Sequence, residues 1–414
     1  MKHLIPLLAF SFLIGCDGEK SNVAPSEGSP EEAASEAPSE GSLKETASEA
    51  KPPEAVSVNP NLKYEIKGDA VTITSCNRKT SGDLIIPATI QGKAVTSVGE
   101  WAFNGCTSLN SITIPDSVTS IAEGAFNGCT SLKTIEVSAG NVNYTDVEGV
   151  LFYKGKTLLN TYPAGKASAN YVIPNSVTSI GSGAFSYCTG LTSITIGNGI
   201  SSIGENAFNG CTSLTTIEVS MDNMNYTDVE GVLFNRGKTL LNTYPANKAG
   251  ANYVIPDSIT SIGDRAFTQC TNLTSITIPD SVTRVGYWAF TQCTSLTSIT
   301  IPDSVNSIGG YTFWSCTSLT SITIPDSVTS IGNYAFADCS SLKSITIPDS
   351  VNSIGNYAFF ICGKLTEVTF LGNAPKIANY VFEESSPTIY RKPEAKGWGE
   401  TLAGRPVKLI TEKP

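Results

Sequence analysis

This sequence of 414 residues has one histidine, no excess of positive charge and few long apolar runs. The single histidine is His3, which lies in a segment that we expect to be removed from the mature protein. Without it the chain cannot form a Ser-His-Asp triad, a Cys-His pair or a histidine-ligated zinc site. We therefore predict that the protein is not an enzyme and that it uses no cofactor.

Basic residues are outnumbered along the chain. There are 27 Lys and Arg against 37 Asp and Glu, for a formal net charge of −10, and no basic stripe stands out. Nucleic-acid binding depends on clustered Lys and Arg that neutralise phosphates. The charge pattern therefore predicts no nucleic-acid partner.

The apolar run at residues 4–14 follows Lys2 and is too short to cross a bilayer. It predicts a secretory signal peptide over residues 1–15. The sequence Leu-Ile-Gly-Cys that ends at Cys16 resembles the bacterial lipobox, which implies cleavage before Cys16 and a lipid on that residue. The alternative is an ordinary signal peptide followed by a chance cysteine. The lipobox predicts a membrane-anchored protein on the periplasmic or cell-surface side of the bacterial envelope.

Residues 16–57 have a different composition, dominated by Ser, Glu, Pro and Ala and without aromatic side chains. Such a segment has too little apolar surface to fold. We interpret it as a disordered acidic tether between the membrane anchor and a folded region.

From residue 84 onward the sequence repeats with a period of 23 residues, which is typical of solenoids. A Phe-x-x-Cys signature marks the register, and its cysteines are Cys106, Cys129, Cys188, Cys211, Cys270, Cys293, Cys316, Cys339 and Cys362. A tenth copy has Phe382 but carries Ser385 in place of the cysteine. One unit cannot bury its apolar face alone, whereas stacked units form a continuous core.

Each repeat contains the apolar spacing L-x-x-I-x-I, as in residues 273–278, which predicts a β-strand with alternating inward and outward side chains. Pro279 ends that strand, and Asp280 and Ser281 suit a turn. Val282 and the residues around it predict a short second strand. The Ala-Phe-x-x-Cys segment is spaced as in a short helix or 3₁₀ turn.

The pattern L-x-x-I-x-I-P-x-x-V-x-x-I-G-x-x-A-F-x-x-C resembles the leucine-rich repeats of bacterial BspA-like surface proteins. This resemblance implies an α/β leucine-rich-repeat solenoid: a strand-rich, right-handed, horseshoe-like coil with a parallel sheet on one side and short helical turns on the other. It also implies a role in adhesion to a host matrix or to other cells.

Within the solenoid, predicted over residues 84–390, two near-identical inserts occupy residues 138–170 and 220–252. The apolar stretches 150–152 and 158–159 suggest that each insert forms a hairpin that protrudes from the edge. Residues 58–83 are predicted to form an N-terminal hairpin cap, and residues 391–414 a C-terminal cap.

The ladder cysteines are expected to be buried free thiols rather than disulfides. Neighbouring rungs would hold their Cβ atoms about 5 Å apart, which exceeds the roughly 3.8 Å typical of a disulfide. The sequence leaves the state of Cys76, which lies outside the ladder, undetermined.

Aspartate recurs after proline in the turn, as at Asp280, Asp303 and Asp326. A column of carboxylates could collect calcium, but the calcium-binding nonapeptide repeat is missing and Asx turns explain these residues. We predict no metal site.

Two sets of exposed side chains are candidates for binding a protein or glycan partner. One is an aromatic column at the residue before the Ala of Ala-Phe, with one neighbouring tryptophan: Trp288, Tyr311, Trp314, Tyr334, Tyr357 and Tyr380. The other is a pair of hydroxyl rows on the L-x-x-I-x-I strands: Ser275, Thr277, Ser298, Thr300, Ser321 and Thr323. Stacking that merely stabilises the fold remains an alternative for the aromatic column, and β-propensity alone can explain the hydroxyl rows.

The sequence favours a lipid-anchored envelope protein whose solenoid binds or adheres to a protein or glycan. One alternative is a structural spacer without a specific partner. A remote one is an ice-binding surface formed by the hydroxyl rows.

Overall fold

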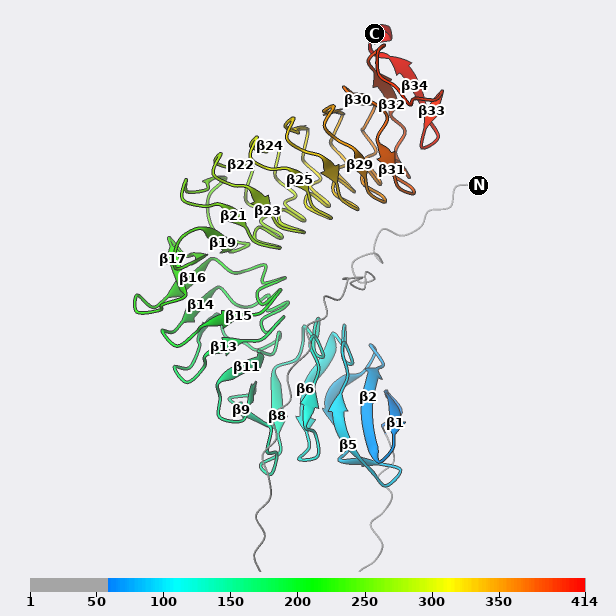
Figure 1. Ribbon diagram of the computed structural model, residues 1–414. Helices are drawn as coiled ribbons and strands as arrows, with labels where there is room; N and C mark the ends of the chain where they lie inside the picture. Colours follow the sequence, from blue (N-terminus) through cyan, green and yellow to red (C-terminus); the bar gives the residue numbers. More distant parts are fainter. Residues whose placement is uncertain (1–58, 414) are drawn as a thin grey trace, which may run out of the picture. The chain divides into compact units, whose positions relative to one another are not determined.

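The structure of the protein, a computed structural model, describes residues 59–413 (Figure 1). These residues belong to one compact unit, Ala55–Pro414. The expected signal peptide, the expected lipidation site Cys16 and the expected acidic tether lie outside the described residues. Within residues 59–413, no helix is long and apolar enough to span a membrane.

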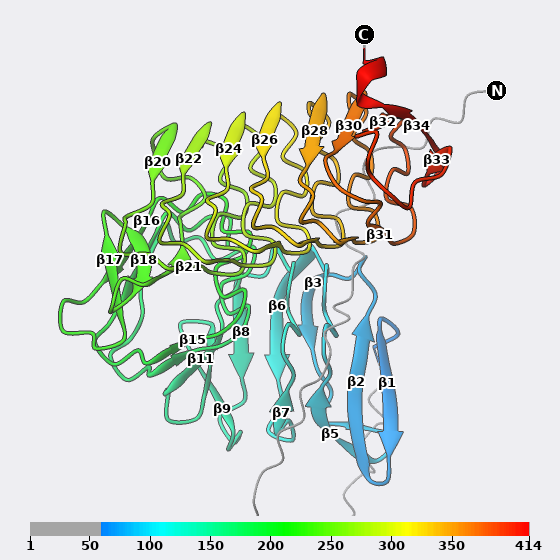
Figure 2. The same cartoon turned by 45° about the horizontal axis from the view of Figure 1, so that its top comes forward.

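Each coil contributes one strand to a first row of parallel strands, formed mainly by the L-x-x-I-x-I segments. These strands pair in the groups β3-β6-β8, β12-β14-β16, β20-β22-β24-β26 and β28-β30-β32-β34, and Figure 2 shows β20 to β30 side by side. Their bounds are β3 Ser81–Ile85, β6 Ser108–Ile114, β8 Thr134–Val137, β12 Asn170–Val172, β14 Ser193–Ile196, β16 Thr216–Val219, β20 Asn252–Val254, β22 Ser275–Thr277, β24 Ser298–Thr300, β26 Ser321–Thr323, β28 Ser344–Ile347, β30 Glu367–Phe370, β32 Thr388–Arg391 and β34 Arg405–Leu409.

A second row follows the turn after proline in each coil and also consists of parallel pairs, most of them two residues long. Its strands are β5 Lys93–Val98, β7 Ser120–Ile121, β11 Leu158–Thr161, β13 Ser179–Ile180, β15 Ser202–Ile203, β19 Leu240–Thr243, β21 Ser261–Ile262, β23 Arg284–Val285, β25 Ser307–Ile308, β27 Ser330–Ile331, β29 Ser353–Ile354 and β31 Lys376–Ile377. Most Leu, Ile and Val side chains of both rows point inward and are almost completely buried, whereas Ile85, Val172 and Val254 are exposed.

The spacing of the Ala-Phe-x-x-Cys segment, on the remaining side of each coil, predicted a short helix or 3₁₀ turn, and the structure shows hydrogen-bonded turns there, such as Cys293 N to Phe290 O at 3.2 Å. In the coil of Trp288, the backbone is left-handed at Trp288 (φ 62°) and again at Gln292 (φ 57°), which interrupts a helix. The N–H groups of Phe290 and Gln292 instead donate to Thr312 O (2.9 Å) and Trp314 O (2.7 Å) in the next coil. Within residues 59–413, the one helical element is the 3₁₀ helix η1, Ile410–Glu412.

The ten described cysteines are free and buried. Each ladder thiol from Cys129 onward lies close to a backbone carbonyl of the preceding coil, as with Cys339 Sγ and Phe313 O at 3.2 Å. Ser385 uses its hydroxyl in the same way, at 2.7 Å from Phe359 O. The ladder position therefore supplies a small buried donor, not only apolar volume, and serine can replace cysteine there.

Replacing Cys339 tests this role. Cys339→Ala should lower the free energy of unfolding by about 1–3 kcal/mol, because the buried carbonyl of Phe313 loses its donor. Cys339→Ser should lose less, since its hydroxyl can donate as Ser385 does. Urea unfolding of the two variants beside the unchanged chain measures the difference. A serine variant less stable than the alanine variant would contradict the assignment.

The N-terminal hairpin consists of β1 (Leu62–Lys67) and β2 (Ala70–Cys76), which pair antiparallel. β2 pairs in parallel with β5 of the second row. At the other end, β34 adds a parallel strand beyond β32, so the strand expected to be the last, residues 388–390, has one more beside it. Beside it, β33 (Thr401–Leu402) pairs antiparallel with β34. Near the N-terminal hairpin, β4 (Thr89–Ile90) pairs antiparallel with β5.

The two inserts contain the expected hairpins, but these do not protrude. In the first insert, β9 (Tyr144–Val147), β10 (Val150–Tyr153) and β11 form an antiparallel meander, and β11 continues in parallel to β13. In the second, β17 (Tyr226–Val229), β18 (Val232–Asn235) and β19 repeat this arrangement. Figure 1 shows β9 beside β8 and β17 beside β16.

The middle strand of each insert is buried on both faces. Leu151 packs into the core that precedes the first insert, whereas Val150 and Phe152 pack into the core that follows it. Leu233 and Phe234 divide in the same way between the second and third cores. Each insert therefore separates two successive cores, because side chains alternate along its middle strand and pack into the core on either side.

Each insert also accepts hydrogen bonds from backbone N–H groups of the last strands of the two preceding rows. Gly149 O accepts from Ile135 N of β8 at 2.9 Å, and Tyr144 Oη accepts from Ile121 N of β7 at 2.8 Å. Gly149 is required at this approach, since a Cβ there would lie 2.3 Å from Thr134 Oγ1. Gly231 and Tyr226 make the equivalent contacts in the second insert.

Candidate binding surface: the aromatic column

The aromatic column, Trp288, Tyr311, Tyr334, Tyr357 and Tyr380, occupies the same position in five successive coils. At each of these residues the backbone is left-handed, with φ between 56° and 62°. Such a conformation favours glycine or asparagine and is unusual for a bulky side chain. Earlier coils have Gly124, Gly183, Asn206 and Arg265 at this position, all with a left-handed backbone.

The column residues stack face to face. Centroid distances between neighbours are 3.8 Å for Trp288–Tyr311, 4.7 Å for Tyr311–Tyr334, 4.8 Å for Tyr334–Tyr357 and 5.0 Å for Tyr357–Tyr380. Interplanar angles run from 4° to 17°. The stacking that the sequence suggested as a stabilising role is therefore present.

Further side chains flank the column. The Arg265 guanidinium lies 4.5 Å from the Trp288 ring centroid, a cation–π contact that covers one end. Trp314 meets Trp288 and Tyr311 edge to face, and Phe360 meets Tyr357 in the same way. The structure thus brings Trp314 to the column, as expected.

The column is partly accessible to solvent. Four of its residues are half-buried, and Tyr380 is 57% exposed. Burial, followed by the charge of Tyr357, raises the pKa of Tyr334. That hydroxyl therefore stays protonated at neutral pH and can both donate and accept a hydrogen bond.

Trp101 belongs to the same repeat position and was missing from the sequence analysis. Its φ is 57° and it is 44% exposed. A Cβ on Gly124, in the next coil, would lie 2.9 Å from the Trp101 ring, so the indole covers that glycine. The signal was available, because Trp101 precedes Ala102 and Phe103 as the column residues precede Ala and Phe.

The hydroxyl rows lie on different elements from the aromatic column, on β22, β24 and β26. Register pairs Ser275 with Ser298 and Ser298 with Ser321, and Thr300 with Thr323. Thr277, Thr300 and Thr323 are exposed. The two candidate sets are therefore separate parts of each coil, one on first-row strands and one on the turns after the second row.

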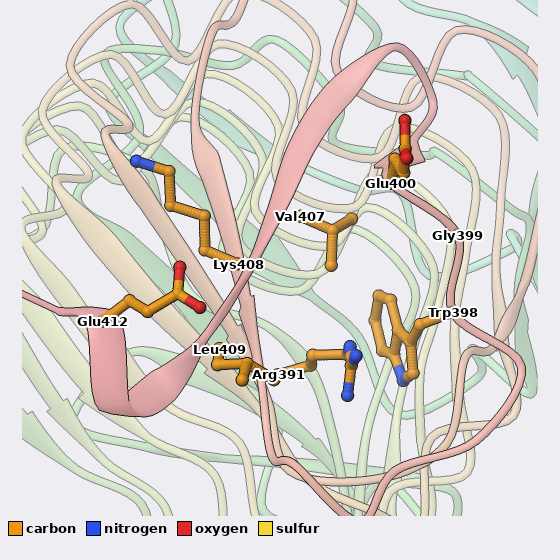
Figure 3. Close-up of a pocket in the computed structure, with 8 residues that line it drawn as sticks. All are labelled: Arg391, Trp398, Gly399, Glu400, Val407, Lys408, Leu409 and Glu412. Carbon is orange, nitrogen blue, oxygen red and sulfur yellow. The ribbon is translucent and has the colours of Figure 1, made fainter.

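A pocket of about 420 Å³ near the C-terminus was not anticipated from the sequence (Figure 3). The Trp398 indole in its wall packs edge to face on Phe370 at 5.0 Å. The Arg391 guanidinium donates to Lys392 O at 3.0 Å. The pocket is lined by Arg391, Trp398, Gly399, Glu400, Val407, Lys408, Leu409 and Glu412. Within residues 59–413, no group of three or more His, Cys, Asp or Glu side chains is placed to hold a metal ion.

The repeat and the coil geometry define a bacterial leucine-rich-repeat solenoid. The sequence matches the family described as BspA type leucine rich repeat region over residues 83–165, 160–249 and 246–328. This match covers more than half of the chain, so the chain belongs to that family. No curated protein matches it.

Several solved structures resemble this chain. A leucine-rich repeat protein from Eubacterium ventriosum is 23% identical, with a TM-score of 0.50 over 82% of this chain and 97% of that one. The pneumococcal vaccine antigen PcpA is 22% identical, with a TM-score of 0.50 over 81% and 93%. A leucine rich cell surface protein from Faecalibacterium prausnitzii is 27% identical, with a TM-score of 0.49 over 75% and 93%.

Proposed function

We propose that this chain is a non-enzymatic, lipid-anchored protein of the bacterial cell envelope whose solenoid binds a protein partner through the aromatic column. Membership of the BspA type family supports a repeat scaffold for binding or adhesion. The signal peptide and lipobox supply the anchor, and the acidic tether joins it to the solenoid. Site chemistry, not fold, must identify the partner.

The observation that carries this proposal is the occurrence of bulky aromatics where the backbone favours glycine. Each left-handed residue other than glycine costs about 1–2 kcal/mol. Each aromatic pair returns about 0.5–1.5 kcal/mol. Five such residues cost about 5–10 kcal/mol and four stacked pairs return about 2–6 kcal/mol, so stacking by itself gives no stability reason for the column.

The geometry favours a protein over a glycan as the partner. Sugars dock on the open faces of aromatic rings, but the faces within this column are covered by neighbouring rings at 3.8–5.0 Å. What remains is a row of ring edges and phenol hydroxyls. Tyr and Trp presented in this way are preferred anchors of protein interfaces.

The test is capture of a partner from envelope and extracellular extracts by the immobilised chain, followed by mass spectrometry. A specific protein retained by the chain supports the proposal. If the chain instead retains a purified glycan as strongly as it retains material from the extract, the partner is a glycan and not a protein. Retention of nothing specific leaves the structural spacer as the better account.

Anchoring has its own prediction. Cys16→Ser should move the protein from the detergent phase to the aqueous phase, because the lipid is attached to the Cys16 thiol. Phase partitioning of cell lysates measures this, with Cys76→Ser as a control that keeps the lipobox. Continued detergent-phase partitioning of Cys16→Ser would contradict lipid anchoring.

A further inference from the structure

Two cysteines lie where the N-terminal hairpin meets the first coil. Cys76 is the last residue of β2, and its backbone N–H donates to Ala102 O at 2.6 Å. In the next coil, Phe103 N donates to Ala125 O at 2.8 Å in the same way. Cys76 therefore occupies the backbone position at which later coils carry the phenylalanine of the Phe-x-x-Cys signature.

This placement brings a second thiol toward the cysteine ladder. In the following coil, Cys129 Sγ lies 3.1 Å from the carbonyl oxygen of Phe103, the signature phenylalanine. For Cys106, the corresponding position one coil earlier is held by Cys76. Both sulfurs lie close to one carbonyl oxygen, Asn77 O, which is 3.7 Å from Cys76 Sγ and 3.8 Å from Cys106 Sγ.

Cys76 differs from the ladder cysteines in the direction of its pKa shift, because its contact with Cys106 favours the Cys76 thiolate and raises the pKa of Cys106. The neighbouring Cys106 thiol lowers the pKa of Cys76 to about 7, and the Thr80 hydroxyl, 3.3 Å from Cys76 Sγ, acts in the same direction. By contrast, burial raises the pKa of Cys129 and of Cys362 to about 12. A thiolate beside a second thiol is the arrangement that thiol–disulfide exchange requires.

We propose that Cys76 and Cys106 form a disulfide on exposure to a disulfide oxidant, covalently joining the N-terminal hairpin to the first coil. The Cys76 thiolate attacks one sulfur of the oxidant and releases the other as a thiol. Cys106 then loses its proton and attacks the Cys76 sulfur of the mixed disulfide. Two protein thiols are oxidised to one disulfide, and the oxidant disulfide is reduced to two thiols.

The same reaction is disfavoured among the other ladder cysteines. Neighbouring rungs stack about 4.8 Å apart, which is wider than the Cβ separation of about 3.8 Å that a disulfide prefers. Cys76 occupies the phenylalanine position of its rung and not the cysteine position, so it is not held one rung directly before Cys106 as the ladder cysteines are held to one another. The proposal therefore specifies one disulfide, with the other described cysteines left reduced.

The experiment treats the reduced full chain with oxidised glutathione, alkylates it under denaturing conditions and maps its peptides. We expect the loss of two alkylatable thiols and one linked peptide pair that contains Cys76 and Cys106. Because the crosslink restricts the unfolded chain, the oxidised protein should melt several degrees higher than the reduced protein.

Matched variants make the result specific. Cys76→Ala should abolish the linked peptide and the shift in melting temperature, whereas Cys339→Ala, in the ladder, should leave both in place. Three outcomes would overturn the proposal: retention of every alkylatable thiol in the unchanged chain, linkage of other cysteines, or a glutathione adduct at Cys76 that Cys106 does not resolve.

Discussion

Phe152→Ala is expected to lower the free energy of unfolding by about 3–5 kcal/mol, the range for removing a large buried aromatic side chain. Phe152 is 0% exposed and packs in the core that follows the first insert, while its neighbour Leu151 packs in the core that precedes it. The cavity would therefore open beside a partition that two cores share. Urea unfolding followed by circular dichroism measures the loss.

Two comparisons sharpen this prediction. Phe234→Ala, at the equivalent position of the second insert, should produce a loss of similar size. Lys156→Ala, at the exposed tip of the first insert, should change stability by less than about 0.5 kcal/mol. If Phe152→Ala were as mild as Lys156→Ala, the insert would be an appended loop and not a partition.

Replacing Tyr311 and Tyr334 together by asparagine is expected to abolish capture of the partner with little change in melting temperature. Asparagine is the matched replacement, since Asn206 already occupies this position with φ 57°. The stacking energy that is lost is offset by a lower backbone strain, because asparagine tolerates the left-handed conformation better than tyrosine does. Capture from extracts and thermal unfolding are measured on the same preparations.

The control for the column lies on the hydroxyl rows. Thr300→Ala with Thr323→Ala removes two exposed hydroxyls from β24 and β26 and should leave capture unchanged. Loss of capture in this control alone would move the site to the hydroxyl rows. A clear fall in melting temperature of the asparagine variant, with capture intact, would leave the column a purely stabilising stack.

The sequence by itself determined the repeat, its register and its family. A 23-residue period with fixed apolar positions permits one outcome, stacked coils with parallel strands, because every unit must bury the same face against its neighbours. The strand at residues 275–277 and the stacking of Tyr311 on Tyr334 follow from that period alone. So does the burial of ladder thiols such as Cys339.

Only the tertiary structure decided what lies between the coils. The Ala-Phe-x-x-Cys spacing fits a short helix or a 3₁₀ turn, and the structure decides for turns, because residues such as Trp288 adopt a left-handed backbone and direct the following N–H groups to the next coil. Apolar content predicted the hairpins of the inserts but placed them at the edge of the solenoid, whereas Leu151 and Phe152 pack into two different cores. These features depend on contacts between coils, and a local pattern of residues contains no information on which neighbour receives a hydrogen bond or a side chain.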